Sequence, residues 1–597
     1  MIGVTYVFGV TGFAQYDRVH NNPFAWTNAF YNALLLFFLK CPHLDPPINL
    51  PLEFARWSGV GVGFWVALAF AGKLLRRDVF GWWHRRRKGR VILCSSGEQG
   101  IALLHSLLDQ SKSVAVLDEL PEGELTDEAE LKHCPIIYGK PNLQETWQQA
   151  GIQTAGRLVI AGQTDGTTAE ILDCALKAAR DARLKPLSFP CDVQLGDMDL
   201  RLAIEKTWSK PAELPLLVGF SDPFAISARK LLLEIMPLDG TGISEHDPRQ
   251  VHLVILGFGR MGRAVAVEAA YLGQFANQKV LRISVLDRDA RRHEQAMRFR
   301  YRNFNRAASI YFYEQEACSE ATWKLLEEIC QEPGMLVSIA ICFDHELLAV
   351  EIALRLRSLA RQTNTPMAVR LRTNHGLAKV LEAAAVEKTP TPPVQTPSPS
   401  ESSVSKSALP PSTPGGAKPK DPPIHAFGAL EETCNFALYP DPFRDDMARN
   451  FHKEHVANAQ GAGRDPTKEE LLREWEKMPE MHKNSSRRHV DHLSIKLRAL
   501  HRKIAHTTNP ATEAIFTPQE IPFLSEWEHR RWCAERWLDG WTPGPKPKNE
   551  ELRTHPDLKP WSELEPVVKD YDTKIIEATA GVLRELGKQI EAGAPTT

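Results

Sequence analysis

The chain has 597 residues, too many for one hydrophobic core, and at about 150 residues per domain it is expected to fold into several units. Its 72 basic residues nearly balance its 74 acidic ones, so no global positive field favours nucleic acid as a partner. The 10 cysteines form no Cys-x-x-Cys pair and have no histidine at zinc-ligand spacing, which argues against a metal site and is typical of a reducing compartment.

Residues 1–78 are predicted to be a membrane segment. Residues 57–75 are nearly uncharged, and with residues 50–55 they approach the roughly 20 residues that cross a bilayer, so we expect a transmembrane helix at about residues 55–75. The dense basic residues from Arg76 to Arg90 then place the bulk of the chain in the cytoplasm, at a bacterial-type inner membrane. A buried helix of a soluble domain is the alternative.

Two shorter apolar segments precede this helix. Residues 29–41 have the length of a re-entrant or interfacial helix, and residues 1–14 fit the end of a longer membrane helix. This order resembles the pore unit of potassium channels. Residues 41–47 read CPHLDPP rather than T-V-G-Y-G, so selective potassium conduction is not predicted.

Residues 89–235 are predicted to form a first Rossmann-like domain with a parallel sheet. A strand, a tight turn, a helix and a second strand follow one another over residues 89–119. Glycines in such a turn let the backbone approach a pyrophosphate at the helix N-terminus, and an acid after the second strand binds ribose hydroxyls. The candidate nucleotide-binding residues are Ser95, Gly97, Gly100 and Asp118. Since Ser95 replaces the first glycine, binding here is expected to be weakened or altered.

The stretch over residues 135–178 resembles the TrkA-N family of nucleotide-binding domains, which regulate potassium transport. The matching positions are Gly139, Ala150, Gly151 and Asp165. Lys140 and Thr168 depart from the family pattern, which has an acid and asparagine there. The resemblance implies assembly around a membrane pore, so a homo-oligomer is expected.

Residues 249–383 are predicted to form a second Rossmann-like domain with an intact G-x-G-x-x-G turn. Its candidate nucleotide-binding residues are Gly257, Gly259, Gly262 and Asp287. The expected ligand is NAD(H) or another adenine nucleotide. Arg260 and Arg263 lie on the first helical turn, where they either pair with phosphate or are solvated. His345 between two acids is interpreted as a helix N-cap rather than a catalytic residue.

A linker over residues 384–424 separates this domain from the rest. It is rich in Pro, Ser and Thr, lacks apolar periodicity and is predicted to be a disordered tether. The module beyond it, residues 425–580, is therefore expected to move independently of the Rossmann pair.

The C-terminal module is predicted to be mostly α-helical, and residues 524–572 resemble the ryanodine-receptor (RyR) repeat domain. The resemblance is carried by Glu526, His529, Trp532, Trp541, Gly544, His555, Pro556, Pro560, Trp561, Leu564, Lys569 and Asp572. Most of the tryptophans are expected to form a small core. The candidate residues for an anionic ligand, a small nucleotide or phosphopeptide, are Trp532, Arg536, Trp541, Lys546 and His555.

The predicted fold is thus α/β, with two Rossmann-like domains after an N-terminal transmembrane segment and a helical RyR-type module. The leading functional hypothesis is a membrane-anchored nucleotide sensor that regulates ion transport, with the lipid bilayer and a nucleotide as partners. A membrane-tethered signalling or defence scaffold without conductance is the first alternative. An NAD-dependent oxidoreductase ranks last, because no convincing acid-base set accompanies the second glycine turn, and we expect no enzymatic activity.

Overall fold

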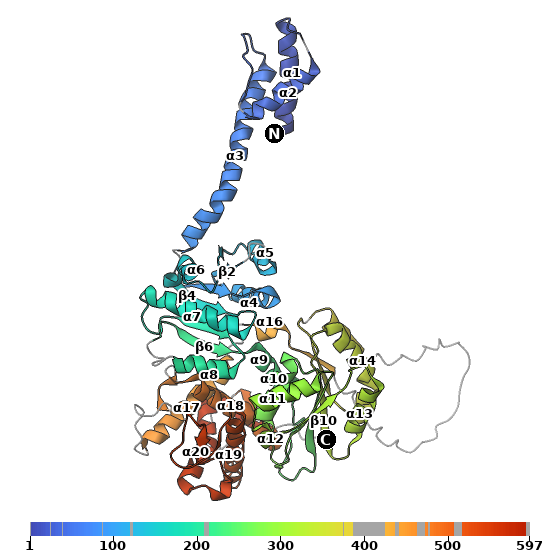
Figure 1. Cartoon of the computed structure of the whole chain (residues 1–597), viewed down its shortest axis with the longest axis vertical. Helices are drawn as coiled ribbons and strands as arrows, with labels where there is room; N and C mark the ends of the chain where they lie inside the picture. The colour runs from blue at the N-terminus through green and yellow to red at the C-terminus, as the bar shows by residue number, and fades with distance from the viewer. Residues whose placement is uncertain are drawn as a thin grey trace, which may run out of the picture.

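The computed structural model of the chain describes residues 2–23, 25–38, 40–85, 88–110, 112–119, 123–207, 214–373, 375–385, 424–435, 441–461, 472–475, 478–506 and 516–592, with side chains except at 69, 71–85, 198 and 382–385. An N-terminal helical unit stands apart from two helix-covered parallel sheets and a C-terminal helical module (Figure 1). Nearly all of the predicted linker lies outside the described residues.

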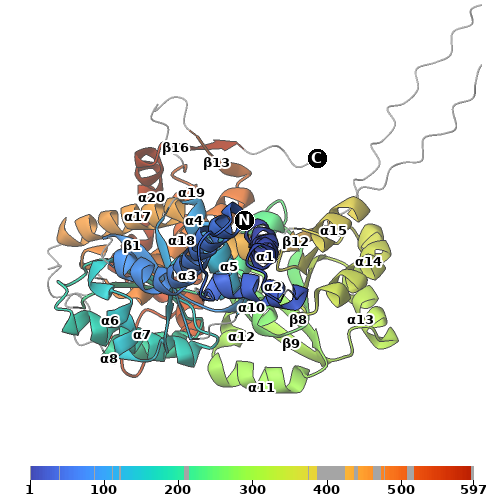
Figure 2. The ribbon, with the colours of Figure 1, turned by 90° about the horizontal axis from the view of Figure 1, so that it is seen from above.

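The N-terminal unit is a small helical bundle, which the long last helix connects to the first sheet (Figures 1 and 2). Its elements are α1 (Ile2–Val19), α2 (Trp26–Leu35), the 3-10 helix η1 (Leu36–Phe38) and α3 (Leu50–Arg85). Glycines let the helices approach closely: a Cβ at Gly12 would lie 2.7 Å from the Cα of Leu52, and one at Gly63 would lie 3.0 Å from the carbonyl oxygen of Phe37. Small residues therefore determine this packing.

The predicted transmembrane span at residues 55–75 is helical and lies within α3. Of the helices in the part of the chain that the structure describes, none is both long and apolar enough to cross a membrane. The side chains of residues 69 and 71–75 lie outside that description. The expected membrane-crossing helix is therefore not shown.

The first sheet has six parallel strands in the order β3-β2-β1-β4-β5-β6. Its strands are β1 (Arg90–Cys94), β2 (Val114–Asp118), β3 (Ile136–Tyr138), β4 (Ala155–Ile160), β5 (Pro190–Gln194) and β6 (Leu217–Ser221). Its helices are α4 (Gly97–Asp109), α5 (Glu124–Leu131), α6 (Gln144–Gln149), η2 (Ile152–Thr154), α7 (Asp165–Asp181), α8 (Met198–Thr207), α9 (Pro223–Lys230) and the π-helical η4 (Leu231–Ile235). Every residue of β1 is buried, as expected for a parallel strand covered on both faces.

The second sheet also has six parallel strands, in the order β12-β11-β10-β7-β8-β9. Its strands are β7 (Gln250–Leu256), β8 (Arg282–Asp287), β9 (Ser309–Glu314), β10 (Met335–Ile341), β11 (Met367–Arg370) and β12 (Ile424–Phe427). Its helices are α10 (Arg260–Leu272), α11 (Ala290–Arg300), α12 (Phe304–Ala307), α13 (Glu320–Gln331), α14 (Glu346–Thr363) and α15 (Leu377–Ala385). The predicted α/β class with two Rossmann-like sheets is confirmed.

Strand β12 lies beyond the predicted linker, yet it pairs in parallel with β11. The short helix α16 (Leu430–Thr433) follows at once and packs against α4 and α9 of the first domain. The predicted start of the C-terminal module at residue 425 is therefore wrong, because the first residues after the linker add a strand to the second sheet and a helix that packs against the first domain.

The described residues of the C-terminal module form four long helices and two small sheets. Its elements are α17 (Pro442–Gly461), α18 (Glu480–Ala499), β13 (Arg502–His506), α19 (Glu520–Leu538), β14 (Thr542–Pro543), β15 (Thr554–His555), η7 (Trp561–Glu563), α20 (Pro566–Glu585) and β16 (Lys588–Ala592). Strand β13 pairs antiparallel with β16, and β14 pairs in parallel with β15. The predicted helical character of the module is confirmed.

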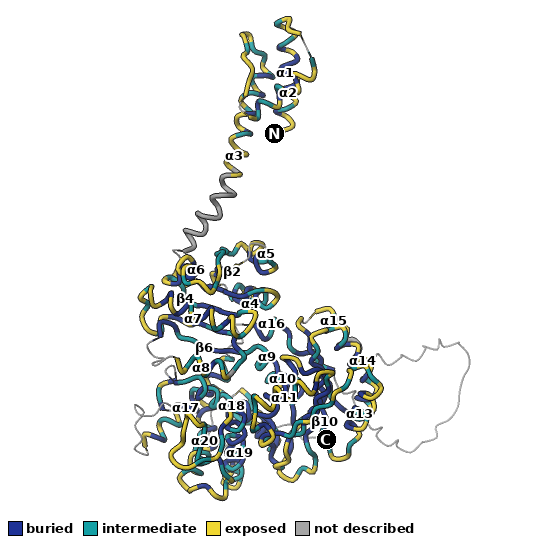
Figure 3. The backbone as a smooth tube through the Cα atoms, in the orientation of Figure 1, coloured by how far each residue is buried: buried dark blue, intermediate teal, exposed yellow. Residues whose placement is uncertain are grey.

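This module shares a core with the second Rossmann domain, and buried backbone continues from one into the other (Figure 3). The indole N–H of Trp527 donates to the carbonyl oxygen of Gln274 at 2.8 Å. Arg498 also donates to both carboxylate oxygens of the buried Asp239, at 3.0 and 3.1 Å. The expectation that the module moves independently is wrong, because large buried contacts hold it against both Rossmann domains.

Candidate nucleotide site

The turn after β1 differs from the usual Rossmann turn because a serine stands at its first position. Ser95 is buried, Ser96 is the extended N-cap of α4, and the left-handed position moves to Gly97, with φ of +60°. No atom lies within 4 Å of where a Cβ of Gly97 would be, so the turn is open. At Gly100 a Cβ would lie 2.8 Å from Cδ2 of Leu125. This glycine lets α4 and α5 pack together.

A cavity of about 330 Å³ opens beside this turn. It is lined by Ser96, Gly97, Gln99, Ala161, Gly162, Gln163, Thr164, Asp165, Gln194, Gly196, Asp222, Pro223, Phe224 and Arg260. Most of these residues follow the carboxyl ends of β1, β4, β5 and β6. Between β1 and β4 the strand order reverses, and this switch point is where parallel sheets bind ligands. We call this space the first-domain cavity.

Two helix N-termini and one arginine of the first-domain cavity can contact an anion. The N-termini of α4 and α7 meet there, with 13 and 17 residues of aligned backbone dipoles behind them. Arg260 of α10 adds a full charge, with its guanidinium carbon 4.6 Å from the ring centroid of Phe224.

The carboxylates in the wall are already engaged. Oδ1 of Asp165 accepts from the Gly196 amide at 3.1 Å and lies 4.0 Å from Nη2 of Arg260. Asp222 caps α9 by accepting from the Phe224 amide at 3.0 Å. The cavity can therefore hold a phosphate against two helix termini and an arginine.

Asp118 ends β2 as predicted for a ribose acid. Its Oδ2 accepts from the hydroxyl of Thr126 at 3.0 Å, and it is not among the residues that line the first-domain cavity. Residues 120–122, which follow Glu119, lie outside the description. Of the four predicted residues, Gly97 lines the first-domain cavity. Ser95, Gly100 and Asp118 do not line it, and Asp118 lies at the end of the neighbouring strand β2.

The second glycine turn has the predicted sequence, and its first glycine is covered while its second is exposed. Gly257 has φ of +86°, and a Cβ there would lie 2.7 Å from the ring of Phe343. Oδ2 of Asp344 lies 3.7 Å from the Cβ position of Gly259, which is the N-cap of α10, and Asp344 pairs with Arg370. An aromatic ring therefore packs against the first glycine of the turn, and an exposed carboxylate lies near the second glycine.

Gly262 and Asp287 hold this second turn together. A Cβ at Gly262 would lie 2.1 Å from the Gly257 carbonyl oxygen, so only glycine fits. Oδ2 of Asp287 accepts from the Phe258 amide at 2.7 Å, and Oδ1 accepts from the Asp289 amide at 2.8 Å. The predicted ribose acid is thus engaged in fixing the backbone of the turn.

Two further predictions concern this domain. His345 is the N-cap of α14, and its Nδ1 accepts from the Leu348 amide at 3.1 Å, which confirms the cap. Arg260 reaches the first-domain cavity rather than the second glycine turn, and this role was missed. No sequence signal pointed to it, because the partner surface lies almost a hundred residues earlier in the chain.

Four of the five candidate ligand residues in the RyR-like region gather in one cluster. The rings of Trp532 and His555 are 4.9 Å apart, those of Trp541 and His555 are 6.0 Å apart, and the guanidinium of Arg536 lies 5.8 Å from Trp532. Lys546 is not part of it, because its exposed ammonium pairs with Glu565 at 2.6 Å.

The residues of this cluster are buried or half-buried and already paired, as in a structural core. Trp541 and Arg536 are buried, and Arg536 donates to Glu535 at 3.0 Å and to Ser485 at 3.2 Å. Burial lowers the pKa of His555 to about 4, so its imidazole is neutral near pH 7. The expectation that most tryptophans are structural is supported, since Trp527 is also fully buried.

Comparison with known proteins assigns two parts of the chain. Residues 91–184 match the TrkA-N domain family, and residues 519–592 match the RyR domain family. The TrkA-N match runs from β1 through α7 and so includes both helix N-termini of the first-domain cavity. No curated protein matches the sequence.

Several solved structures are similar at low identity. GsuK bound to ADP is 12% identical, with 64% of this chain and 89% of that chain covered and a TM-score of 0.34. The GsuK channel bound to NAD is 12% identical, with 64% and 77% covered and a TM-score of 0.33. A dipicolinate synthase from Bacillus halodurans is 11% identical, with 47% and 81% covered and a TM-score of 0.17. These TM-scores are too low to carry an argument. On the family matches, the chain contains a TrkA-N domain at residues 91–184 and an RyR domain at residues 519–592.

Proposed function

We propose that this chain is a membrane-anchored nucleotide sensor that regulates ion transport, and that it binds the nucleotide in its first Rossmann domain. The phosphates of an adenine nucleotide such as ADP or NAD lie in the first-domain cavity, against the N-termini of α4 and α7 and beside Arg260. Ligand occupancy changes the balance between two conformations, and α3 transmits the change to the N-terminal unit.

The observation that carries this proposal is the first-domain cavity itself. Its volume of about 330 Å³ lies at the switch point of the sheet, within the range typical of ligand pockets. Its two helix termini fall within the TrkA-N match. The regulated ion is proposed to be potassium, on the match to the TrkA-N family alone.

The surface of the N-terminal unit supports a membrane location. Large apolar side chains are exposed on all its helices, where yellow backbone dominates Figure 3. They include Ile2, Val4, Val7, Phe8, Trp26, Phe30, Tyr31, Leu34, Phe38, Leu50, Phe54, Trp57, Phe64, Trp65, Leu68 and Phe70. So much exposed apolar surface on a small unit favours a lipid or protein environment over water. Packing through glycines, as at Gly59 and Gly63 on α3, is typical of helices in a bilayer.

A second candidate is a signalling scaffold in which the N-terminal unit only anchors the chain, and the altered filter sequence CPHLDPP favours it. In either case a homo-oligomer is proposed, because the match to the TrkA-N family implies assembly around a membrane pore. Neither candidate requires catalysis, and we propose that the chain is not an enzyme.

The proposal is tested by titrating the full chain, in lipid nanodiscs, with ADP, NAD and NADH in a calorimeter. Saturable binding of one nucleotide per chain is expected, and no heat with any of the three would overturn the proposal. Potassium flux into vesicles that contain the chain then separates the candidates: nucleotide-dependent flux supports the transport role, and its absence under every nucleotide supports the scaffold.

A further inference from the structure

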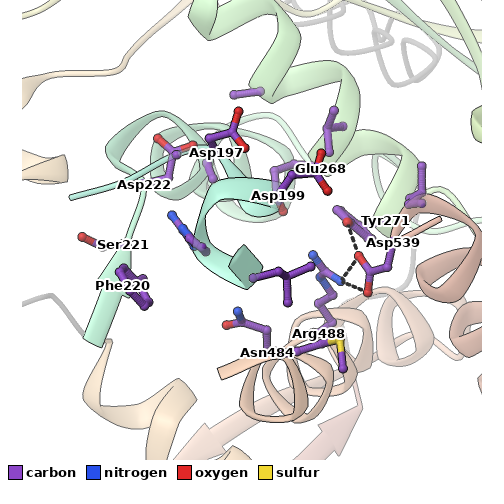
Figure 4. A pocket seen from close by; sticks show the side chains of 18 of the residues that line it. Asp197, Asp199, Phe220, Ser221, Asp222, Glu268, Tyr271, Asn484, Arg488 and Asp539 are labelled. Atoms are coloured by element: carbon purple, nitrogen blue, oxygen red, sulfur yellow. Dashed lines mark hydrogen bonds and ion pairs between the residues drawn. The ribbon is translucent and has the colours of Figure 1, made fainter. Parts of the chain in front are cut away.

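A second cavity, of about 320 Å³, lies where the two Rossmann domains and the C-terminal module meet (Figure 4). The first domain contributes α8, α9 and the end of β6, the second contributes α10 and the end of α11, and the C-terminal module contributes α17, α18 and the end of α19. We call it the junction cavity. It adjoins the first-domain cavity, since Asp165, Asp222 and Arg260 line both.

Ion pairs between modules close the rim of the junction cavity. Arg300 of the second domain lies 3.0 Å from Asp197 of the first. Arg553 of the RyR domain lies 3.6 Å from Asp199. These contacts join all three modules around one space.

Carboxylates on the C-terminal side of the cavity are neutralised by arginines. Asp539 accepts from Tyr271 at 2.8 Å and from Arg488 at 3.3 Å, as the dashed lines in Figure 4 show. Asp445 is held by two hydrogen bonds from Arg487, at 2.7 and 2.9 Å. These acids therefore contribute little net negative charge to the cavity.

Two arginines in the wall lack such partners. Arg201 is 8% exposed, its Nε donates to the Leu195 carbonyl oxygen, and its Nη2 has no hydrogen-bond partner among the described residues. Arg263 lines the cavity and forms no ion pair with a carboxylate in the same described set. A buried guanidinium N–H that lacks an acceptor destabilises the folded chain unless a ligand supplies one.

Aromatic rings complete the wall. Phe220, Tyr271 and Trp541 line the cavity, and the guanidinium of Arg201 lies 5.9 Å from the centroid of Phe220. Arginines among aromatic rings favour a compact anion, since guanidinium groups match phosphate oxygens in geometry and charge.

From this arrangement we infer that the junction cavity is a second ligand site, separate from the nucleotide site, that binds a small phosphorylated anion through Arg201 and Arg263. A ligand there contacts all three modules, so its binding stabilises their present arrangement. The chain would then respond to a second ligand besides the nucleotide. The two sites share Arg260 and Asp165 in their walls.

The test uses inorganic pyrophosphate as the probe and the full chain carrying Ser96→Asp, which places a carboxylate at the phosphate position of the first-domain cavity. Calorimetry is expected to show saturable pyrophosphate binding to this chain. Adding Arg263→Gln or Arg201→Gln is expected to weaken binding at least tenfold. Arg288→Gln, which removes an exposed arginine of the second domain outside the cavity, is the matched control and should leave the affinity unchanged.

Three outcomes would overturn the inference: no pyrophosphate binding to the unmodified chain, binding that Ser96→Asp alone abolishes, or binding that neither arginine substitution weakens. Thermal unfolding of each variant shows that it is folded, and Arg263→Gln should be the milder of the two because Arg263 is only partly buried. Nucleotide binding is measured separately, so failure of the nucleotide proposal leaves this result interpretable.

Discussion

Of the two glycine turns in this chain, the one with the incomplete fingerprint borders an open cavity, and the one with the complete fingerprint has its first glycine covered. The turn at residues 95–100 lacks the first fingerprint glycine, yet it borders an open cavity with two helix N-termini and an arginine. The turn at residues 257–262 has all three glycines, yet Phe343 packs on the first and the carboxylate of Asp344 lies near the second. A complete fingerprint therefore defines a backbone shape, while the residues that follow the neighbouring strand β10 determine what packs against it.

The backbone explains how the incomplete turn still works. A serine cannot easily adopt the left-handed conformation of Gly257, so the chain places that conformation at Gly97 instead. The second turn keeps its glycines because its own backbone is packed too tightly for a Cβ. Gly97 keeps the first turn open, whereas Gly262 permits the tight packing of the second.

The largest effect is expected from the last glycine of the second turn. Gly262→Ala would bring a Cβ within 2.1 Å of a carbonyl oxygen, so it should destabilise the second domain by about 3 kcal/mol or more. Gly100→Ala meets only the end of a leucine side chain, at 2.8 Å, and should cost about 1 kcal/mol. Thermal unfolding of the two variants tests this order, and equal losses would contradict it.

A smaller effect is expected from Glu268 on α10, which lines the junction cavity. Burial raises its pKa from 4.5 to about 7. The neutral carboxyl group of Glu268 is tolerated in the folded chain, and this contribution to stability is fully present below pH 4.5. The contribution is lost as the pH rises through 7, because the buried carboxylate becomes charged. At pH 8 the charged carboxylate therefore destabilises the folded chain.

Glu268→Gln should remove this dependence. The free energy of unfolding of the variant minus that of the native chain should be larger at pH 8 than at pH 5, by about 1 to 2 kcal/mol. Unfolding temperatures at the two pH values provide the measurement. Glu328→Gln, which removes an exposed glutamate of the same domain, is the control, and an identical pH profile for both variants would count against the assignment.

The smallest effect is expected from Arg260, which begins α10 of the second domain and lines the first-domain cavity. Arg260→Gln removes one of several phosphate contacts and should weaken nucleotide affinity by roughly threefold to tenfold, about 1 kcal/mol. Arg291→Gln, an exposed arginine paired with Glu314 on the second domain, should not change it. Unchanged affinity in Arg260→Gln would place the phosphates elsewhere.

Local sequence patterns predicted the parts of the fold that depend on neighbouring residues. Strands β1, β2, β7 and β8, the two glycine turns and the acids at Asp118 and Asp287 lie where periodicity and turn chemistry placed them. The cap at His345 follows from the same local rules.

The features that were missed depend on residues far apart in the chain. Strand β12 joins its sheet across the long linker, Phe343 covers a turn more than eighty residues before it, and Arg260 reaches into another domain. The junction cavity likewise needs three modules. Each requires tertiary packing, which a local pattern does not encode.

The most direct test of the account compares ADP affinity in Ser96→Asp and Gly259→Asp, two substitutions at matched N-caps. Aspartate is a favourable N-cap, and both positions have extended backbone, so both variants should fold. We expect Ser96→Asp to weaken ADP binding at least tenfold in calorimetry while Gly259→Asp leaves it unchanged. The reverse, with binding lost in Gly259→Asp and kept in Ser96→Asp, would show that the second turn is the nucleotide site.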